Sequence, residues 1–181
     1  MKQFPDEERK KLRELPLVTR IPEISNLVVC HASTRKDNDS IYAHTPESQL
    51  QEMFSNTSER FVIRAHNHVG QERTCGDRLI ITCGSVGMPL DSHPTAQYLL
   101  LEQNGKGWHI RHQSVPYDVD ITLRRFSETG YIDEAGPIAR LLRREIATAS
   151  HYVVPFLRAF KRWSDAGSIS LDVAVDRFLN S

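Results

Sequence analysis

Phe61-Val62-Ile63-Arg64-Ala65-His66-Asn67-His68 is an apolar, strand-like run that ends in two histidines. A second such run, Asn26-Leu27-Val28-Val29-Cys30, ends at His31. Alternate side chains of an extended segment lie on one face, so we expect His66 and His68 to point toward the same place. If the two runs are neighbouring strands, His31 reaches that place from the adjacent strand end. Neutral imidazole is the commonest side-chain metal ligand, and the three histidines therefore predict a metal site.

Two kinds of metal chemistry are compatible with three imidazoles. They can hold one zinc ion with an open position for water. They can also be nitrogen ligands of a two-metal hydrolase, in which two cations clamp the attacking and leaving oxygens. The second chemistry needs carboxylates, because two adjacent dications require negative charge and a bridging oxygen. The nearby acids Asp37, Asp39 and Asp91 have no spacing that directs them to the histidines, so we expect them at the surface.

The composition is typical of a soluble globular protein with one core. Of 181 residues, 39% are hydrophobic and 25% charged. The 23 basic and 23 acidic residues balance, which leaves no basic excess for a nucleic-acid partner. No apolar run approaches the roughly 20 residues of a membrane span, and no signal-type stretch opens the chain. Three cysteines without CxxC spacing predict reduced thiols in a cytoplasmic protein, with Cys30 and Cys83 packed in the core.

The hydrophobic pattern predicts an α/β protein, with strands in the middle of the chain and helices after residue 120. Strands are expected at 17–21, 26–30, 61–65, 69–74, 78–83, 96–102 and 107–113. Helices are expected at 5–14, 46–54, 121–128, 137–149, around 156–163, and after Ser170. We expect Thr45, Asp120 and Ser170 to cap the helices that they precede. The polar segment from Ser33 to Thr45 is predicted to be a long loop.

Four segments resemble motifs of the calcineurin-like metallophosphoesterase family. Val29-Cys30-His31-Ala32-Ser33 resembles the family's V-x-H-G-S, and Ala65-His66-Asn67-His68-Val69 resembles its G-H-T-H-V. Gly84-Ser85-Val86-Gly87-Met88-Pro89-Leu90-Asp91 is similar to G-S-V-G-x-P-x-D, and Ala96-Gln97-Tyr98-Leu99-Leu100-Leu101 to the strand that follows it. The order and spacing of the segments also fit, and the resemblance covers roughly residues 15–113.

The resemblance implies a two-metal centre with divalent manganese, iron or zinc. His31 and His66 would ligate one ion, and His68 the other. Ala32 and Ala65 stand where the family has glycine, so we expect both to adopt negative φ. The glycine-rich segment 84–89 has two interpretations, a phosphate cradle of backbone N–H groups or a tight turn that supports the histidine loop, and the pattern favours the turn.

The resemblance also implies an αββα sandwich that is incomplete at its N-terminus. The family's carboxylates come from the motifs D-x-H, G-D-x-x and G-N-H-D, which lie before the segment that resembles residues 15–33. None of these motifs occurs in residues 1–14, and the sequence identifies no catalytic residue. We therefore expect residues 1–119 to form the C-terminal part of a metallophosphoesterase-like domain, and residues 120–181 to form a helical extension packed on it.

Two functions remain as alternatives. The chain is either a truncated metallophosphoesterase, which hydrolyses a small phosphate ester by a metal-activated water and is impaired alone, or a non-catalytic module that retains part of the metal site. Arg35 and His44, in the polar loop, are candidates for binding the substrate phosphate. Missing strands would leave a sheet exposed, which predicts a homo-oligomer or a covering partner chain, and no membrane or nucleic-acid partner is expected.

Overall fold

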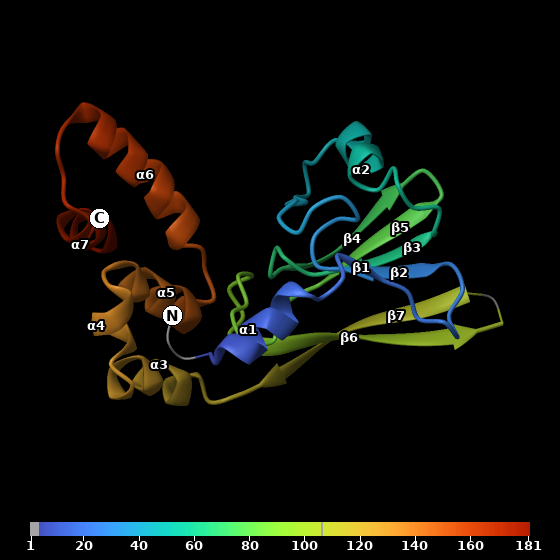
Figure 1. Cartoon of the computed structure of the whole chain (residues 1–181), viewed down its shortest axis with the longest axis horizontal. Helices are drawn as coiled ribbons and strands as arrows, with labels where there is room; N and C mark the ends of the chain where they lie inside the picture. Colours follow the sequence, from blue (N-terminus) through green and yellow to red (C-terminus); the bar gives the residue numbers. More distant parts are fainter. Residues whose placement is uncertain (1–3, 106) are drawn as a thin grey trace. The chain divides into compact units, whose positions relative to one another are not determined.

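The chain, described for residues 4–105 and 107–181 by a computed structural model, divides into two compact units (Figure 1). The first comprises the chain up to Asn67 together with Gln71–Thr82. The second comprises His68–Gly70 together with Cys83–Ser181. The expected boundary between residues 119 and 120 stays a prediction, because it separates a metallophosphoesterase-like domain from an extension and not two compact units.

The first unit is a mixed α/β layer. Among the described residues its sheet has the strand order β1-β2-β3-β5-β4, in which β2, β3 and β5 are parallel and β1 is antiparallel to β2. The predicted strands and helices of this unit are confirmed, although β1 is shorter than expected. The elements are α1 (Asp6–Arg13), β1 (Val18–Thr19), β2 (Leu27–Cys30), α2 (Glu47–Met53), β3 (Phe61–Arg64), β4 (Gly70–Cys75) and β5 (Arg78–Cys83).

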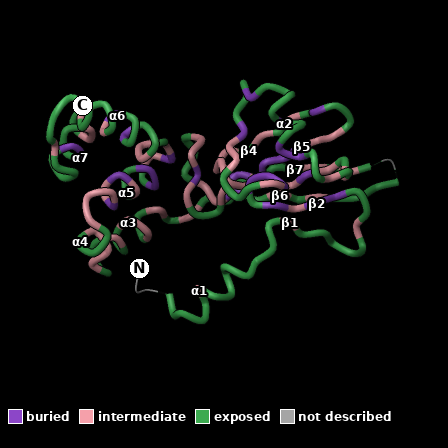
Figure 2. The backbone as a smooth tube through the Cα atoms, turned by 45° about the horizontal axis from the view of Figure 1, so that its top comes forward, coloured by how far each residue is buried: buried purple, intermediate pink, exposed green. Residues whose placement is uncertain are grey.

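The core of this unit is a row of apolar side chains across the parallel strands. Val28 pairs with Val62, and Val62 pairs with Ile80 in register. All three are almost completely buried, as the β-branched runs of these central strands predict. Leu50 of α2 and Phe54 pack in the same cluster. The buried stretches of β2, β3 and β5 contrast with α1, which is exposed along nearly all of its length (Figure 2).

The start of α2 differs from the expectation for one residue. The helix begins at Glu47 with Pro46 at its N-cap, and no side chain caps it. The hydroxyl of Thr45 instead accepts a hydrogen bond from the backbone N–H of Tyr42 at 2.8 Å. Thr45 was therefore wrongly predicted as the cap, because its hydroxyl closes the preceding turn of the loop.

The second unit combines a β-hairpin with helices. The hairpin pairs β6 (Thr95–Asn104) with β7 (Gly107–Pro116) in antiparallel register. Leu141, Phe156, Ala174 and Val175 form the buried centre of the helical part. No helix in residues 4–105 or 107–181 is long and apolar enough to cross a membrane. The helices are α3 (Val119–Glu128), α4 (Tyr131–Ala135), α5 (Ile138–Thr148), α6 (Val153–Ala166) and α7 (Leu171–Leu179).

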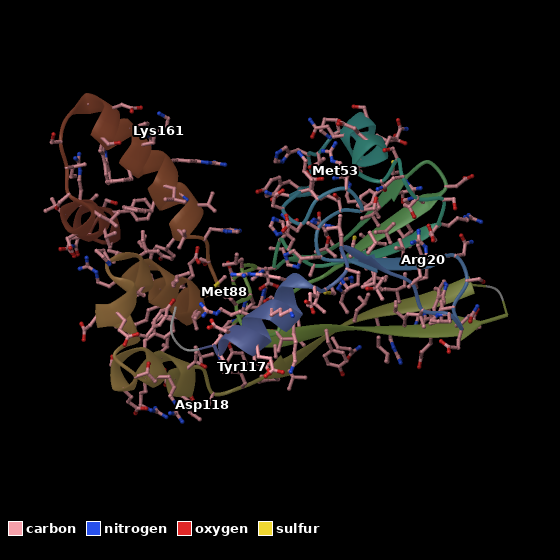
Figure 3. All side chains as sticks on the ribbon, viewed as in Figure 1. Arg20, Met53, Met88, Tyr117, Asp118 and Lys161 are labelled. Atoms are coloured by element: carbon pink, nitrogen blue, oxygen red, sulfur yellow. The ribbon has the colours of Figure 1, made fainter. Side chains whose placement is uncertain are left out.

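Helix capping corrects one prediction and confirms another. The cap of α3 is Asp118, where the chain enters the helix (Figure 3), and not Asp120. The Asp118 carboxylate accepts hydrogen bonds from the N–H groups of Asp120 at 3.0 Å and Ile121 at 3.3 Å. The helix thus begins earlier than expected, and Asp120 lies in its first turn. Ser170 caps α7 as predicted, because its hydroxyl accepts from the N–H of Val173.

A buried arginine ties the end of β3 to the loop that follows β2. Arg64 is only 1% exposed. Its Nε donates to the carbonyl of Ala32 at 2.5 Å, one Nη donates to the hydroxyl of Thr82 at 2.8 Å, and the other donates to the carbonyl of Asp39 at 2.8 Å. The planar guanidinium matches three acceptors, so it fixes the path of the polar loop under the strand ends.

Replacement of Arg64 with methionine tests this role. The Arg64→Met variant keeps much of the buried volume but leaves the Ala32 and Asp39 carbonyls without their donors, so we expect a loss of about 3 kcal/mol in the free energy of unfolding. Urea denaturation followed by circular dichroism measures the change. The matched control is Arg60→Met, an exposed arginine just before β3, which we expect to change stability by less than about 0.5 kcal/mol. Equal losses in the two variants would contradict the role of Arg64.

Candidate metal centre

His31 and His66 lie in direct contact at the carboxyl ends of two parallel strands. β2 and β3 pair in register up to Val29 and Ile63, so the residues that follow them lie at the same edge of the sheet. His31 Nε2 is 3.2 Å from His66 Nδ1, and the rings meet edge to face with an interplanar angle of 79°. The expected convergence of these two histidines is confirmed.

The distance between the two nitrogens fits a shared cation. Two imidazoles bound to one ion at about 2.0–2.1 Å place their nitrogens roughly 2.8–3.4 Å apart for coordination angles between octahedral and tetrahedral. The measured separation of 3.2 Å lies in this interval. His31 and His66 are therefore close enough to be two ligands of one divalent metal ion.

The backbone at His66 is not extended, which corrects the expectation of alternating side chains. β3 ends at Arg64, and both His66 and His68 have left-handed backbone, with φ of 67° and 57°. The N–H of Asn67 donates to the carbonyl of Ala65 at 2.8 Å, so His66 is the centre of a γ-turn. Histidine tolerates positive φ better than most residues. Strained backbone of this kind is concentrated at functional sites.

The two alanines that stand where the resembled motifs have glycine behave as predicted. Neither Ala32 nor Ala65 has positive φ. The left-handed step lies one residue later, at His66, so the turn does not require glycine before it. The Ala65 N–H donates to the carbonyl of His31 at 2.9 Å, which joins the two histidine segments directly.

His68 belongs to the second unit, where the glycine-rich loop holds its ring. Its Nδ1 lies 2.7 Å from the carbonyl oxygen of Met88, and its own carbonyl accepts from the N–H of Leu90 at 3.1 Å. A carbonyl partner requires a proton on Nδ1, so Nε2 keeps its lone pair for a ligand. The interpretation of segment 84–89 as a turn that supports the histidine loop is confirmed.

The polar loop after His31 is organised by an ion-pair network. Asp39 accepts hydrogen bonds from Arg35 Nε at 2.8 Å and from the Ser33 hydroxyl at 2.7 Å. The bond from Arg35 is the main reason why the pKa of Asp39 lies below its ordinary value. Arg35 also pairs with Glu52. Its guanidinium is thus held by two carboxylates, and its predicted contact with a substrate phosphate stays a prediction.

The other loop residues differ in their relation to His31. Asp37 is exposed and lines a pocket together with His31 and Arg35. His44 is also exposed and stacks on Tyr42, with ring centroids 5.5 Å apart. His44 is not among the residues that line this pocket, so its predicted role in substrate binding also stays a prediction.

Asn67 has a structural role that the sequence did not indicate. Its side-chain oxygen accepts from the N–H of Ile41 at 3.0 Å, and Gln71 donates to the carbonyl of Ile41 at 2.6 Å. These bonds attach the polar loop to the histidine turn. In the sequence, Asn67 only stands where the resembled motif has threonine, and a long-range partner such as Ile41 leaves no local signal.

The described residues contain no complete metal-binding group. Among residues 4–105 and 107–181, no three histidine, cysteine, aspartate or glutamate side chains are placed to hold one ion. Cys30 is buried as expected, and burial raises the pKa of its thiol to about 11, so it is protonated at neutral pH. Cys75 is buried and Cys83 is only half-buried, which departs from the expectation of a core position for Cys83.

Solved structures that are similar to this chain include the following two. A metallophosphoesterase from Sphaerobacter thermophilus matches with a TM-score of 0.64 and 20% sequence identity, over 81% of this chain and 63% of that protein. A hypothetical protein from Pyrococcus horikoshii matches with a TM-score of 0.63 and 16% identity, over 81% of this chain and 56% of that protein. No family model and no curated protein matches the sequence.

These similarities establish the fold. The chain has a mixed α/β fold similar to that of a metallophosphoesterase, which confirms the fold class and the resemblance derived from the four motifs. It spans less than two thirds of the length of either solved structure.

The support that the glycine-rich loop gives to His68 can be tested at Gly84. This residue has a φ of 85°, and a Cβ there would lie 2.1 Å from the side-chain oxygen of Gln97. We expect Gly84→Ala to lower the free energy of unfolding by about 2 kcal/mol or more, through positive φ and overpacking together. The control in the same loop is Gly87→Ala, where a Cβ meets nothing within 4 Å. Urea denaturation compares the two, and equal stability would contradict the constraint.

Proposed function

We propose that this chain supplies the histidine ligands of a divalent-metal centre that hydrolyses phosphate esters. The observation that carries the proposal is the 3.2 Å contact between His31 and His66 at the carboxyl edge of a parallel sheet. The fold similarity to a metallophosphoesterase supports the same reaction class. The substrate is then a small phosphate ester.

The residues of the chain divide the work in the following way. His31 and His66 hold one cation, and the family resemblance assigns His68 to the other, with its Nε2 as the donor. Divalent manganese, iron or zinc, when bound, supplies a Lewis acid for the phosphoryl group and activates water at neutral pH. Arg64 and Asn67 position the segments that carry His31 and His66.

Neutral imidazoles bring no negative charge to balance two dications. Because the described residues offer no third donor beside the His31 and His66 pair, we infer that a complete centre takes its carboxylates from another polypeptide segment or a partner chain. The isolated chain is then a weak metal binder with a trace of activity. This same lack of a third donor in the described residues favours, as a second candidate, a non-catalytic module that retains part of a metal site.

Two further proposals concern the location of the protein and its partners. We propose a cytoplasmic location, because the three cysteines are free thiols. We also propose that a second copy of the chain or a different chain covers an exposed sheet. The balanced charge argues against a nucleic-acid partner.

Metal titration tests the histidine pair. We expect the purified chain to bind Mn²⁺ or Zn²⁺ weakly, and His31→Gln or His66→Gln to raise the dissociation constant about tenfold or more, because each variant loses one of two adjacent ligands. Isothermal titration calorimetry measures the constants. The control is His151→Gln, an exposed histidine of the second unit that leaves binding unchanged. Identical binding by all three variants would reject the pair as a metal site.

Activity on a generic aryl phosphate tests whether the centre is complete. We expect the isolated chain with Mn²⁺ to hydrolyse para-nitrophenyl phosphate at no more than a trace rate, because the carboxylates that balance two dications are lacking. Release of nitrophenolate, followed by absorbance, measures the rate. Robust manganese-dependent turnover that His66→Ala abolishes would show instead that this chain completes the centre alone.

A further inference from the structure

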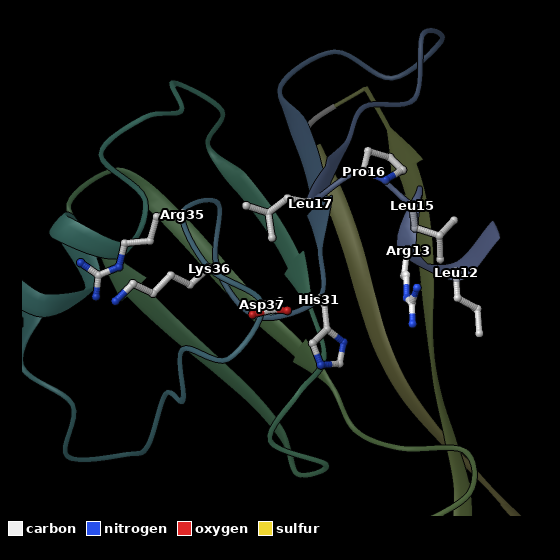
Figure 4. A pocket seen from close by; sticks show the side chains of 9 residues that line it. All are labelled: Leu12, Arg13, Leu15, Pro16, Leu17, His31, Arg35, Lys36 and Asp37. Atoms are coloured by element: carbon white, nitrogen blue, oxygen red, sulfur yellow. The ribbon is translucent and has the colours of Figure 1, made fainter. Parts of the chain in front are cut away.

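The first unit contains a pocket of about 880 Å³ beside His31 (Figure 4). This volume is within the range of small-molecule binding sites, roughly 300–1,000 Å³. One wall comes from the end of α1 and the segment that leads to β1, and the other comes from the polar loop after His31. His31, one of the two proposed metal ligands, lies between these walls.

The wall near α1 is apolar and exposed. Leu12, Leu15 and Leu17 line the pocket and are 56%, 66% and 39% exposed. Pro16 lines the pocket together with them, along the same short stretch of chain. Exposed apolar side chains that lie near one another are typical of ligand or partner sites, because removal of apolar surface from water is favourable. An apolar ligand group would bury this surface.

Two cationic side chains, Arg13 and Lys36, also line the pocket, and the charge of Lys36 contributes to the lowered pKa of Asp39. Among the described residues, the side chains of Arg13 and Lys36 form no ion pair and no hydrogen bond, although both line the pocket. Arg35 differs because Asp39 and Glu52 hold it. The single carboxylate in the lining is Asp37. The lining therefore has an excess of positive charge, which favours an anionic ligand.

We propose that this pocket binds a phosphate ester whose organic group is apolar, aromatic or branched alkyl. The phosphate lies at His31 with Arg13 as its cationic partner, and the organic group packs against the Leu12, Leu15 and Leu17 wall (Figure 4). Cationic donors give strong charge-assisted hydrogen bonds to phosphate oxygens. This substrate class rests on the proposed phosphoesterase function for its phosphate ester. The preference for an apolar organic group comes from the pocket lining.

Binding in the absence of metal tests the ligand class separately from catalysis. The probe is 1-naphthyl phosphate, titrated into the full chain in buffer with EDTA and followed by naphthyl fluorescence. We expect it to bind at least tenfold more tightly than inorganic phosphate or 1-naphthol, which are measured by competition. Each competitor lacks one of the two groups for which the pocket has a wall.

Two variants locate the binding to the pocket. We expect Leu15→Ser and Arg13→Gln each to weaken naphthyl phosphate binding at least threefold. Both residues are exposed, so the chain folds without them. The matched controls are Leu157→Ser, an exposed leucine of α6, and Lys10→Gln, an exposed lysine of α1 outside the lining, and both keep the wild-type affinity.

The outcomes separate this inference from the proposed function. Equal affinity for naphthyl phosphate and inorganic phosphate, or equal binding by Leu15→Ser and Leu157→Ser, overturns the substrate class even if the metal titration succeeds. Selective binding in EDTA supports the ligand class even if His31→Gln and His66→Gln leave metal affinity unchanged, and in that case only the metal centre is rejected.

Discussion

The buried guanidinium of Arg64 is the constraint on which the rest of the site depends. Each of its three nitrogens donates a hydrogen bond, to acceptors from β5 and from both ends of the loop segment between Ala32 and Asp39. A buried charge is costly unless every donor is satisfied, so these acceptors have little freedom to move. The arginine thereby fixes the strand end that leads to His66 and the loop that follows His31. The contact between the histidines results from this framework.

Local strain then completes the arrangement. A left-handed residue such as His66 costs of order 1 kcal/mol or more and persists only where its surroundings determine it. The surroundings here are the Ala65 bond to His31 and the Asn67 bond to Ile41. Together they hold the imidazole of His66 against that of His31 and not along the strand direction. The turn after β3 thus directs the His66 side chain toward the end of the neighbouring strand β2, where His31 lies.

Much of the fold could be predicted from the sequence, because its signals are local. The β-branched runs before His31 and His66 and the cap at Ser170 have short-range causes. The choice of Asp118 over Asp120 was missed because two aspartates two residues apart give the same signal. The backbone of His66 was missed for a different reason. Its conformation is imposed by tertiary hydrogen bonds, which alternation within a strand does not encode.

The histidine pair and the cationic pocket lining can serve one site if a metal ion and an anion bind there together. A dication at His31 and His66 would share the pocket region with Arg13 and Lys36, and Asp37 is the single carboxylate in the lining. Repulsion between these cations and the metal opposes binding of the ion alone. A phosphate dianion offsets the charge of both, so each ligand raises the affinity for the other by the same factor. Weak metal binding by the chain alone is therefore compatible with a centre that assembles around its substrate.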